Sequence, residues 1–348
     1  MTDAAPVSLA AIGLGWVTTN RHIPALRRCS QARLIGVIDH QSGRAAALAR
    51  QLSLKRSATA HSAADVSWLD QVDAVTIGTP PGTHYSLARS YLDAGKHVLV
   101  EKPLAMTVDE AEQLIALAND RGRVLAVVHN FQFTRSVRRT KQLMRSGRLG
   151  DIRSMWAVQL SNPKRRLPAW YEQLPLGLFY DESPHFFYLL RHLTECEPKF
   201  QRIDVLRDRD GAETPARVSV LLDACGIPVQ IDMNFQAPLS EWHIGVLGSK
   251  GAAFVDIFRD ILVVVPNDGS HLARDILRTS AAAMWSHGFG TLESGVLLAV
   301  GRLAYGNDEV VRRFCLACQG ERDVLGGISG IDGAAVVSMQ NQVVNASR

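Results

Sequence analysis

The first 130 residues alternate short apolar runs with longer amphipathic stretches. The apolar runs are Val7–Ile12, Leu34–Ile38, Ala74–Ile77, Val98–Val100 and Val124–Val128. Runs this short and this uniformly apolar are typical of strands buried on both faces. Because helices separate them, they predict a doubly wound parallel sheet of the Rossmann type, with right-handed crossovers. Thr107 and Glu110 have the spacing of a capping box, and Gly95 marks a helix end.

The pattern changes after Gly150, where strand-like segments follow one another without intervening helices. These segments are Ile152–Val158, Ile203–Leu206, Val218–Leu222, Val229–Met233, His243–Leu247, Ala253–Ile257 and Ile261–Val265. Several alternate polar with apolar residues, which predicts a largely antiparallel sheet with one wet face. We therefore expect a dinucleotide-binding domain over 1–128 and an α+β substrate and oligomerisation domain over 129–348. In the latter, residues 331–348 form a closing helix that can pack back on the first domain.

Composition excludes several classes of protein. The net charge of +4 in 348 residues is too small to predict nucleic-acid binding, and no apolar run reaches the roughly 18 residues of a membrane helix. Five scattered cysteines do not form the framework of a small secreted protein, and the first twenty residues lack the basic start of a signal peptide. We expect a protein of the cytoplasm, a reducing compartment, that binds neither nucleic acid nor membranes.

The first apolar run ends in a glycine turn, Gly13-Leu14-Gly15-Trp16-Val17-Thr18, and the second ends in Asp39. Glycines at a strand-to-helix turn let the backbone approach a pyrophosphate, and an acid after the second strand can bind the ribose hydroxyls. Thr18 replaces the third glycine of the usual fingerprint. Since Asp39 would repel a 2′-phosphate, we expect NAD rather than NADP, although Ser42 and Arg44 together could hold that phosphate.

Further motifs follow the later runs. Thr79-Pro80-Pro81-Gly82-Thr83-His84 comes after Ala74–Ile77, Glu101-Lys102-Pro103 after Val98–Val100, and His129-Asn130-Phe131-Gln132-Phe133 after Val124–Val128. Asp181-Glu182-Ser183-Pro184-His185 lies in the second domain. In this order, the motifs resemble those of the glucose-fructose oxidoreductase, inositol dehydrogenase and MocA family of NAD(P)-dependent enzymes.

The resemblance implies roles for individual residues. Lys102 would hydrogen-bond the substrate oxygen that changes oxidation state, Asp181 would orient the substrate or the catalytic pair, and His185 would act as general base. A cis peptide before Pro103 is common in the family. Asn130 would contact the substrate, and no metal is required. The cofactor-binding residues would be Gly13, Gly15, Trp16, Val17, Asp39, Thr79, Pro80, Pro81, His84, Glu101 and Lys102.

The sequence around His185 allows two interpretations. Ser183-Pro184 has the composition of a helix N-cap and first helical residue, which would place His185 in a first turn, where the helix dipole favours neutral imidazole. Alternatively, His185 packs in the core of an aromatic helix. This chain also departs from the family pattern, with Gln132 in place of an arginine, Ser183 in place of a glycine, and an added acid at Glu182.

A basic segment spans residues 135–166, which contain ten Lys or Arg and one acid, Asp151. Five of them, Arg135, Arg138, Arg139, Lys141 and Arg145, fit one solvated helix. Lys164-Arg165-Arg166, however, precedes the Asp181–His185 element in an irregular stretch, so Arg165 is a candidate for binding an anionic substrate such as a sugar phosphate. Cys315-x-x-Cys318 has no second cysteine pair and is expected to be structural.

These observations predict an NAD(P)-dependent oxidoreductase acting on a secondary alcohol or ketone of a sugar, cyclitol or sugar phosphate. Two alternatives remain: a reductase of a non-sugar substrate, similar to dihydrodiol dehydrogenases or biliverdin reductase, and an NAD-binding sensor without catalysis. By resemblance, we also expect a homo-oligomer, a dimer or a tetramer, in which the sheet of the second domain supplies an interface.

Overall fold

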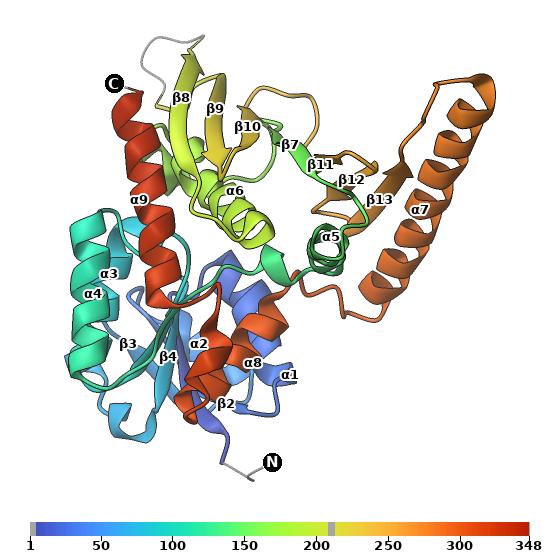
Figure 1. Ribbon diagram of the computed structural model, residues 1–348. Coiled ribbons are helices and arrows are strands. Elements are labelled where there is room, and N and C mark those ends of the chain that lie inside the picture. The colour runs from blue at the N-terminus through green and yellow to red at the C-terminus, as the bar shows by residue number, and fades with distance from the viewer. Residues whose placement is uncertain (1–4, 208–212, 348) are drawn as a thin grey trace. The chain divides into compact units, whose positions relative to one another are not determined.

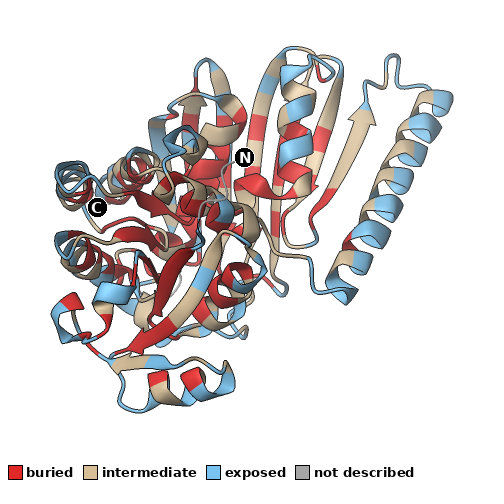
Figure 2. Cartoon of the chain, turned by 90° about the horizontal axis from the view of Figure 1, so that it is seen from below, coloured by how far each residue is buried: buried red, intermediate tan, exposed pale blue. Residues whose placement is uncertain are grey.

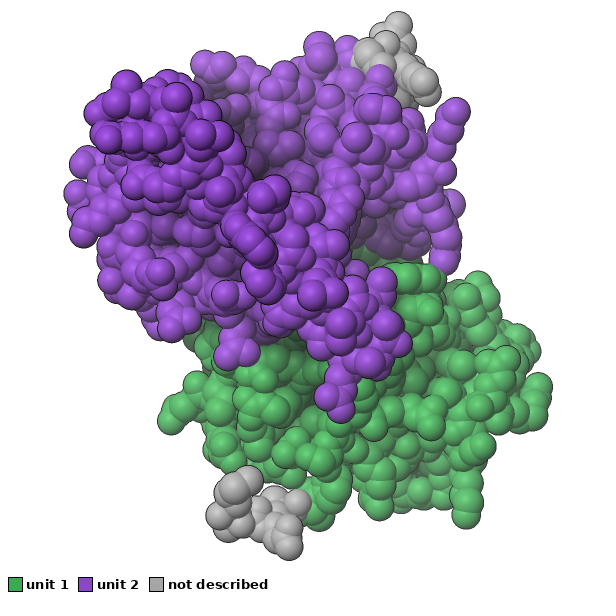
Figure 3. All heavy atoms as spheres, turned by 90° about the vertical axis from the view of Figure 1, so that its right-hand side faces the viewer, with its two compact units in different colours: residues 1–130, 306–338 green, residues 131–305, 339–348 purple. Residues whose placement is uncertain are grey.

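The computed structural model describes residues 5–207 and 213–347. Two compact units, coloured separately in Figure 3, comprise residues 1–130 with 306–338 and residues 131–305 with 339–348. The chain thus returns to the first unit for residues 306–338, which include the first part of the closing helix expected over 331–348. In the described part of the chain, no helix combines the length and the hydropathy needed to cross a membrane.

The first unit contains a six-stranded, wholly parallel sheet of order β3-β2-β1-β4-β5-β6. This is the strand order of dinucleotide-binding folds, and it confirms the predicted class. The sequence analysis missed one strand, β3, which is short and polar. The strands are β1 (Val7–Ile12), β2 (Ala32–Asp39), β3 (Arg56–Thr59), β4 (Ala74–Ile77), β5 (His97–Val100) and β6 (Leu125–Val127).

Helices cover both faces of this sheet, as the two-sided burial of β1 requires. Side chains alternate along β1: Ala10 and Ile12 join a core with residues of α3 and α4, whereas Ala11 joins a second core with residues of α1 and α2. The helices of this unit are α1 (Ile23–Arg28), α2 (Arg44–Gln51), α3 (His84–Asp93), α4 (Val108–Asp120) and α8 (Asn307–Cys318), together with the first part of α9 (Gly330–Ala346). Thr107 and Glu110 form the predicted capping box of α4.

The second unit is built on a seven-stranded sheet of order β13-β12-β11-β7-β10-β9-β8. Its neighbours are antiparallel except for β10 and β7, which are parallel. All seven strand-like segments expected from the sequence are strands. They are β7 (Ile152–Leu160), β8 (Lys199–Leu206), β9 (Arg217–Ala224), β10 (Ile227–Asn234), β11 (Glu241–Gly248), β12 (Gly251–Asp256) and β13 (Ile261–Pro266).

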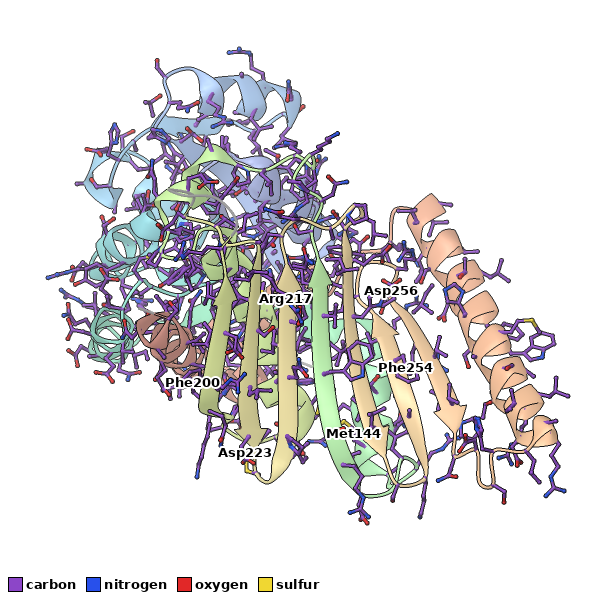
Figure 4. The ribbon with its side chains drawn as sticks, turned by 90° about the horizontal axis from the view of Figure 1, so that it is seen from above. Met144, Phe200, Arg217, Asp223, Phe254 and Asp256 are labelled. Atoms are coloured by element: carbon purple, nitrogen blue, oxygen red, sulfur yellow. A yellow bond between two sulfur atoms is a disulfide. The ribbon has the colours of Figure 1, made fainter. Side chains whose placement is uncertain are left out.

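Two helices, α5 (Arg135–Arg145) and α6 (Leu178–Thr194), contact each other and strands of this sheet, and a third, α7 (Ala273–Ala299), runs along the outer strand β13 (Figures 1 and 4). The basic residues of α5 are not simply solvated, because Arg135 pairs with Asp260 and both Lys141 and Arg145 pair with Glu195.

One disulfide joins Cys196, just after α6, to Cys225 in the turn between β9 and β10. Cys29, Cys315 and Cys318 are free thiols. A reducing environment, which the scattered cysteines led us to expect, would keep all five cysteines as free thiols. The Cys196–Cys225 disulfide differs from that expectation. The reason is spatial: the end of α6 and the β9–β10 turn meet although 29 residues separate the two cysteines.

Candidate active site

The glycine turn after β1 is shaped by the loop that follows β4. Gly13 has a φ of +75°, and a Cβ built on it would lie 2.3 Å from Cγ2 of Thr79. Only glycine combines this backbone conformation with so close an approach. Thr79 is half-buried, Pro80 exposed and Pro81 buried, so the loop after β4 lies directly against the turn.

Thr18 occupies the position of the missing third glycine, and the structure explains how. It is fully buried, and its Oγ1 lies 3.5 Å from the carbonyl oxygen of Gly78. A Cβ on Gly78 would lie 2.2 Å from that Oγ1. The close packing of helix on strand, which the third glycine usually permits, is therefore achieved by a glycine on the facing strand end.

Asp39 stabilises the turn through both carboxylate oxygens. Oδ2 accepts a hydrogen bond from the backbone N–H of Leu14 at 2.7 Å, and Oδ1 accepts one from Gln41 at 2.8 Å. The Arg44 guanidinium lies 3.8 Å from Oδ2 and is 44% exposed. Asp39 thus has lone pairs left for ribose hydroxyls, while Arg44 offers a positive charge beside it.

Behind the turn lies a buried polar chain that the sequence analysis missed. His22 Nε2 lies 2.9 Å from Glu101 Oε1, and its Nδ1 lies 2.8 Å from Thr76 Oγ1. Because the carboxylate can only accept, Nε2 carries the proton and Nδ1 accepts from the threonine hydroxyl. Burial would raise the pKa of Glu101, but the hydrogen bond from His22, together with the nearby charge of Lys102, outweighs it and lowers the pKa of Glu101.

Lys102 follows this anchored glutamate. Its backbone N–H donates to Glu101 Oε2 at 3.1 Å, and its side chain is half-buried. The Lys102–Pro103 peptide is cis, as the resemblance implied. Buried polar groups of the same unit fix the positions of Glu101 and Pro103, the two sequence neighbours of Lys102. The backbone of Lys102 is therefore fixed as well.

His84 supports the two loops rather than lying where a cofactor could reach it. Its ring is fully buried, with Nδ1 2.7 Å from the carbonyl oxygen of Pro103 and Nε2 2.9 Å from that of Thr79. Burial lowers its pKa, and the two carbonyl contacts oppose this. The expectation that His84 binds the cofactor directly is therefore corrected: it ties the loop after β4 to the loop after β5.

The remaining sequence-predicted cofactor residues lie on the turn itself. Gly15 and Val17 are half-buried, and Trp16 is exposed, with the Arg21 guanidinium 5.0 Å from the centre of its ring. Asn130 is buried at the end of the first unit, directly after His129, whose Nδ1 bonds to the carbonyl oxygen of Gly327.

In the second unit, α6 begins at Leu178, and Pro184 lies inside it. The prediction that Ser183 and Pro184 start a helix, with His185 in its first turn, is wrong. The reason is tertiary: the hydroxyl of Thr214 accepts from the N–H of Leu178 at 3.0 Å, which satisfies a free donor at the helix start. The dipole argument for a neutral His185 therefore fails, and Asp181 is the residue in the first turn.

Gln340 of α9 makes the internal proline possible. Pro184 has no N–H to donate to the carbonyl oxygen of Tyr180 four residues earlier. The side-chain amide of Gln340, which is fully buried, donates to that oxygen instead. The helix therefore continues through Pro184, and Asp181 and His185, four residues apart, share one face.

His185 lies in a group of aromatic rings. The centres of the Phe131 and Trp242 rings lie 4.9 and 5.2 Å from its own. Its Nδ1 is 2.8 Å from the Oη of Tyr188, which also accepts from the backbone N–H of Phe131 at 3.1 Å. His185 is half-buried rather than fully enclosed, so aromatic packing and a role in proton transfer both stay open for it.

Arg165 does not present an unpaired charge. Its guanidinium donates to the buried carboxylate of Glu182, which also accepts from Gln159. Burial raises the pKa of Glu182, against the opposing effect of Arg165. Lys164 and Arg166 are exposed. Arg165 thus forms an ion pair with Glu182, and its role in binding an anionic substrate stays a prediction.

Two family models match the chain. "Oxidoreductase family, NAD-binding Rossmann fold" matches residues 7–129, and "GFO/IDH/MocA C-terminal domain" matches residues 137–254. Together they account for more than half of the sequence.

Among curated proteins, the chain is 35% identical to the uncharacterized oxidoreductase YdgJ of Escherichia coli over 52% of this chain and 53% of that protein. It is 32% identical to scyllo-inositol 2-dehydrogenase (NADP(+)) of Bacillus subtilis over 44% and 43% of the two chains. Each match thus spans about half the length of the relative. Among solved structures, GenD2 from gentamicin A biosynthesis in complex with NAD has a TM-score of 0.75 at 20% identity, covering 100% of this chain and 95% of that one.

Proposed function

The chain belongs to the glucose-fructose oxidoreductase, inositol dehydrogenase and MocA (GFO/IDH/MocA) family, and we propose that it is an NAD(P)-dependent oxidoreductase acting on a CH–OH group. The observation that carries the proposal is the pairing of a glycine turn held by Asp39 with a lysine held by Glu101 in one unit. A binding protein without chemistry needs the turn but has no use for the anchored lysine.

The residues present fit a dinucleotide. The cradle is the glycine turn, since a Cβ at Gly13 would already collide with Thr79, and the backbone N–H groups after Gly15 lead into a helix. The pyrophosphate would be held by the turn residues Gly13, Gly15, Trp16 and Val17. The adenosine ribose would be bound by Asp39. The middle part of the dinucleotide would contact Thr79, Pro80 and Pro81. When bound, the nicotinamide supplies the site that accepts or donates hydride.

We propose NAD as the preferred cofactor. Asp39 keeps its carboxylate at the end of β2, where it accepts ribose hydroxyls and repels a 2′-phosphate. Arg44 instead favours NADP, because its guanidinium lies 3.8 Å from that carboxylate and, together with Ser42, could bind a 2′-phosphate. One similar protein is named for NADP(+) and another was solved with NAD, so similarity does not decide the cofactor. We therefore base the proposed cofactor on Asp39 and Arg44.

Proton transfer is assigned to His185. In the tautomer that this role requires, the Nδ1–H of His185 donates to Tyr188 Oη, which also accepts from the Phe131 N–H. Nε2 then holds a lone pair, which takes the hydroxyl proton during oxidation and returns it during reduction. Following the family resemblance, we assign to Lys102 the hydrogen bond to the substrate oxygen that changes oxidation state, and to Asp181, on the same helix face as His185, the orientation of the substrate.

The proposed substrate is a secondary alcohol or ketone of a sugar or cyclitol, supported by the scyllo-inositol dehydrogenase among the relatives. Since Arg165 is neutralised by Glu182, an anionic sugar would have to rely on Lys164 and Arg166. A neutral polyol is therefore the better fit. We propose further that the protein is a homo-oligomer. The cytoplasmic location expected from the sequence stays a proposal, and the Cys196–Cys225 disulfide argues against a strongly reducing compartment.

The test is a turnover assay with NAD and with NADP against matched panels of cyclitols, sugars, sugar phosphates and dihydrodiols, followed by the absorbance of the reduced nicotinamide. Turnover of cyclitols or sugars that disappears in Lys102→Met is the expected result. Tight NAD binding without turnover of any panel member would contradict the enzyme and favour the sensor. Turnover confined to dihydrodiols would contradict the sugar-like substrate.

A further inference from the structure

Helix α7 packs on its own unit through its smallest residues. The side that faces β13 contains Thr279, Ser286, Gly290 and Ser294, all half-buried or buried. A Cβ on Gly290 would lie 2.8 Å from Cγ2 of Ile261, so helix and strand touch closely there. Such side chains bury little apolar surface, and this contact contributes only modestly to the stability of a 27-residue helix.

The opposite side of α7 is apolar and exposed, as the pale blue helix in Figure 2 shows. Trp285 stacks on Phe289 with ring centres 5.6 Å apart. The sequence has no charged residue between Arg278 and Glu293. Large apolar side chains on this side are 55 to 71% exposed, namely Leu277, Met284, Trp285, Phe289, Leu292, Val296, Leu298 and Val300. An ordinary surface helix buries its apolar side, whereas α7 exposes its apolar side.

The exposed area has the size of one half of a protein interface. At about 150–200 Å² for a large apolar side chain, these exposed fractions leave on the order of 800 Å² uncovered. The largest apolar patch of a typical monomer is about 300–600 Å², whereas a stable complex buries about 800 Å² on each partner. A partner that covers this side alone would therefore suffice for a stable association.

Two glycines, Gly288 and Gly295, lie on the exposed side of α7 and are not packed against any part of the chain that the structure describes. A Cβ on Gly288 or on Gly295 would meet no atom within 4 Å. Glycine inside a helix costs about 1 kcal/mol relative to alanine, and neither glycine is required by a neighbour of its own chain. Ala281, Gly288 and Gly295 recur every seven residues, between Met284 on one flank and Leu292 on the other. They form a row of small residues along the exposed side of the helix.

We propose that α7 pairs antiparallel with α7 of a second copy of this chain, about a two-fold axis at Gly288. In that arrangement, Gly288 meets Gly288, Ala281 lies level with Gly295 of the second copy, and Met284 lies level with Leu292. Small residues therefore meet small ones, which permits a close helix contact, and large side chains flank it on both sides.

A second copy fits this surface better than other occupants. A two-fold interface uses the same patch on both partners, so the two areas match, and the association closes at a dimer. A membrane-surface helix would instead carry a face rich in Lys and Arg, but the polar side of α7 lies against β13 and contains no lysine. The inference does not depend on the proposed chemistry, because the assembly is measured without substrate.

The first experiment is sedimentation equilibrium of the full chain. We expect wild type to self-associate at micromolar concentration, and Leu292→Glu to remove that step while the far-ultraviolet circular dichroism and NAD binding persist. Ile331→Glu is the matched control, since Ile331 is an equally exposed apolar residue of a different helix, and it should behave as wild type. A monomeric wild type, or a Leu292→Glu variant with unchanged association, would overturn the proposal.

The second experiment locates the axis independently of any other interface. Gly288→Cys should form an intermolecular disulfide under mild oxidation, because the two-fold places the position opposite itself. Leu206→Cys, at an exposed position of β8, should not. Absence of the Gly288→Cys cross-link contradicts the antiparallel pair. Binding of the monomer to vesicles of phosphatidylcholine and phosphatidylserine, lost in Leu292→Glu, would assign the surface to a membrane and contradict it as well.

Discussion

Tyr188 Oη lies 2.8 Å from Nδ1 of His185 and accepts a hydrogen bond from the backbone N–H of Phe131. The hydroxyl therefore connects the imidazole to the main chain of a neighbouring turn. Nδ1 is therefore the ring nitrogen that faces Tyr188. We propose that Tyr188 positions the imidazole and that Nε2 acts as the base.

Tyr188→Phe keeps the ring and removes the hydroxyl. We expect kcat to fall by about tenfold or more, since a positioned acid–base group contributes about 10²–10⁴, and the pH profile of kcat to shift. NAD affinity should not change. Tyr85→Phe, which removes a hydroxyl bonded to Gln113 on the surface of the first unit, is the control. An unaltered pH profile in Tyr188→Phe would reject the positioning role.

Lys102→Met removes the donor to the reacting oxygen. Loss of one such donor typically costs about 10²–10³ in kcat, and we expect a loss of at least that size with NAD affinity retained, measured by fluorescence titration. Lys55→Met, an exposed lysine far along the chain from the motif, should retain full turnover. Undiminished turnover of Lys102→Met would refute the assignment.

Asp39 and Arg44 should act in opposite directions on cofactor choice. Asp39→Asn keeps the shape but weakens two hydrogen bonds to backbone N–H groups, so NAD affinity should fall by about tenfold, given about 1.5–3 kcal/mol for a bond to a charged group. Arg44→Ala should leave NAD binding intact and reduce any NADP binding. Equal affinity of Asp39→Asn for NAD would show that the carboxylate does not contribute.

Gln340→Leu should destabilise the second unit by about 1–3 kcal/mol, because it removes the buried side-chain amide that donates to the carbonyl oxygen of Tyr180. Pro184→Ala restores an N–H to that carbonyl, so Gln340→Leu should cost less in its presence. Urea unfolding of the two single variants and the double variant measures the coupling. Strict additivity would show that the two residues do not share the Tyr180 oxygen.

His97 should make stability depend on pH. Burial, aided by the charge of Arg123, lowers the pKa of His97 from 6.5 to about 4, and its Nδ1 accepts from the Val124 N–H at 2.8 Å. Between these pH values the unfolded chain binds a proton that the folded chain does not, so stability is full above pH 6.5 and falls by about 3 kcal/mol as pH drops towards 4.

His97→Asn is the test of that slope. The asparagine oxygen can still accept from Val124 but does not titrate, so thermal unfolding between pH 6.5 and pH 4 should be less sensitive to pH in the variant than in wild type. Parallel curves would assign the acid sensitivity to other groups.

The sequence alone was sufficient for the architecture. Short runs such as Val7–Ile12 and alternating ones such as Gln230–Phe235 indicate which faces are buried, and burial of both faces or of one face distinguishes the parallel sheet from the antiparallel one. The motifs around Gly13, Lys102 and His185 were recognisable for the same reason: each is a property of neighbouring residues. The capping box at Thr107 and Glu110 is equally local, and it was found where expected.

Tertiary structure decided everything that depends on a distant partner. Thr214 determines where α6 begins, and Gln340 lets Pro184 lie inside it. Gly78 accommodates Thr18, Glu182 neutralises Arg165, and His84 is enclosed between two loops. Hydrogen bonds and close packing act over a few ångströms in space, whatever the separation along the chain. Local pattern therefore determines which elements form, while the fold decides which side chains remain available for chemistry or for a partner, as along α7.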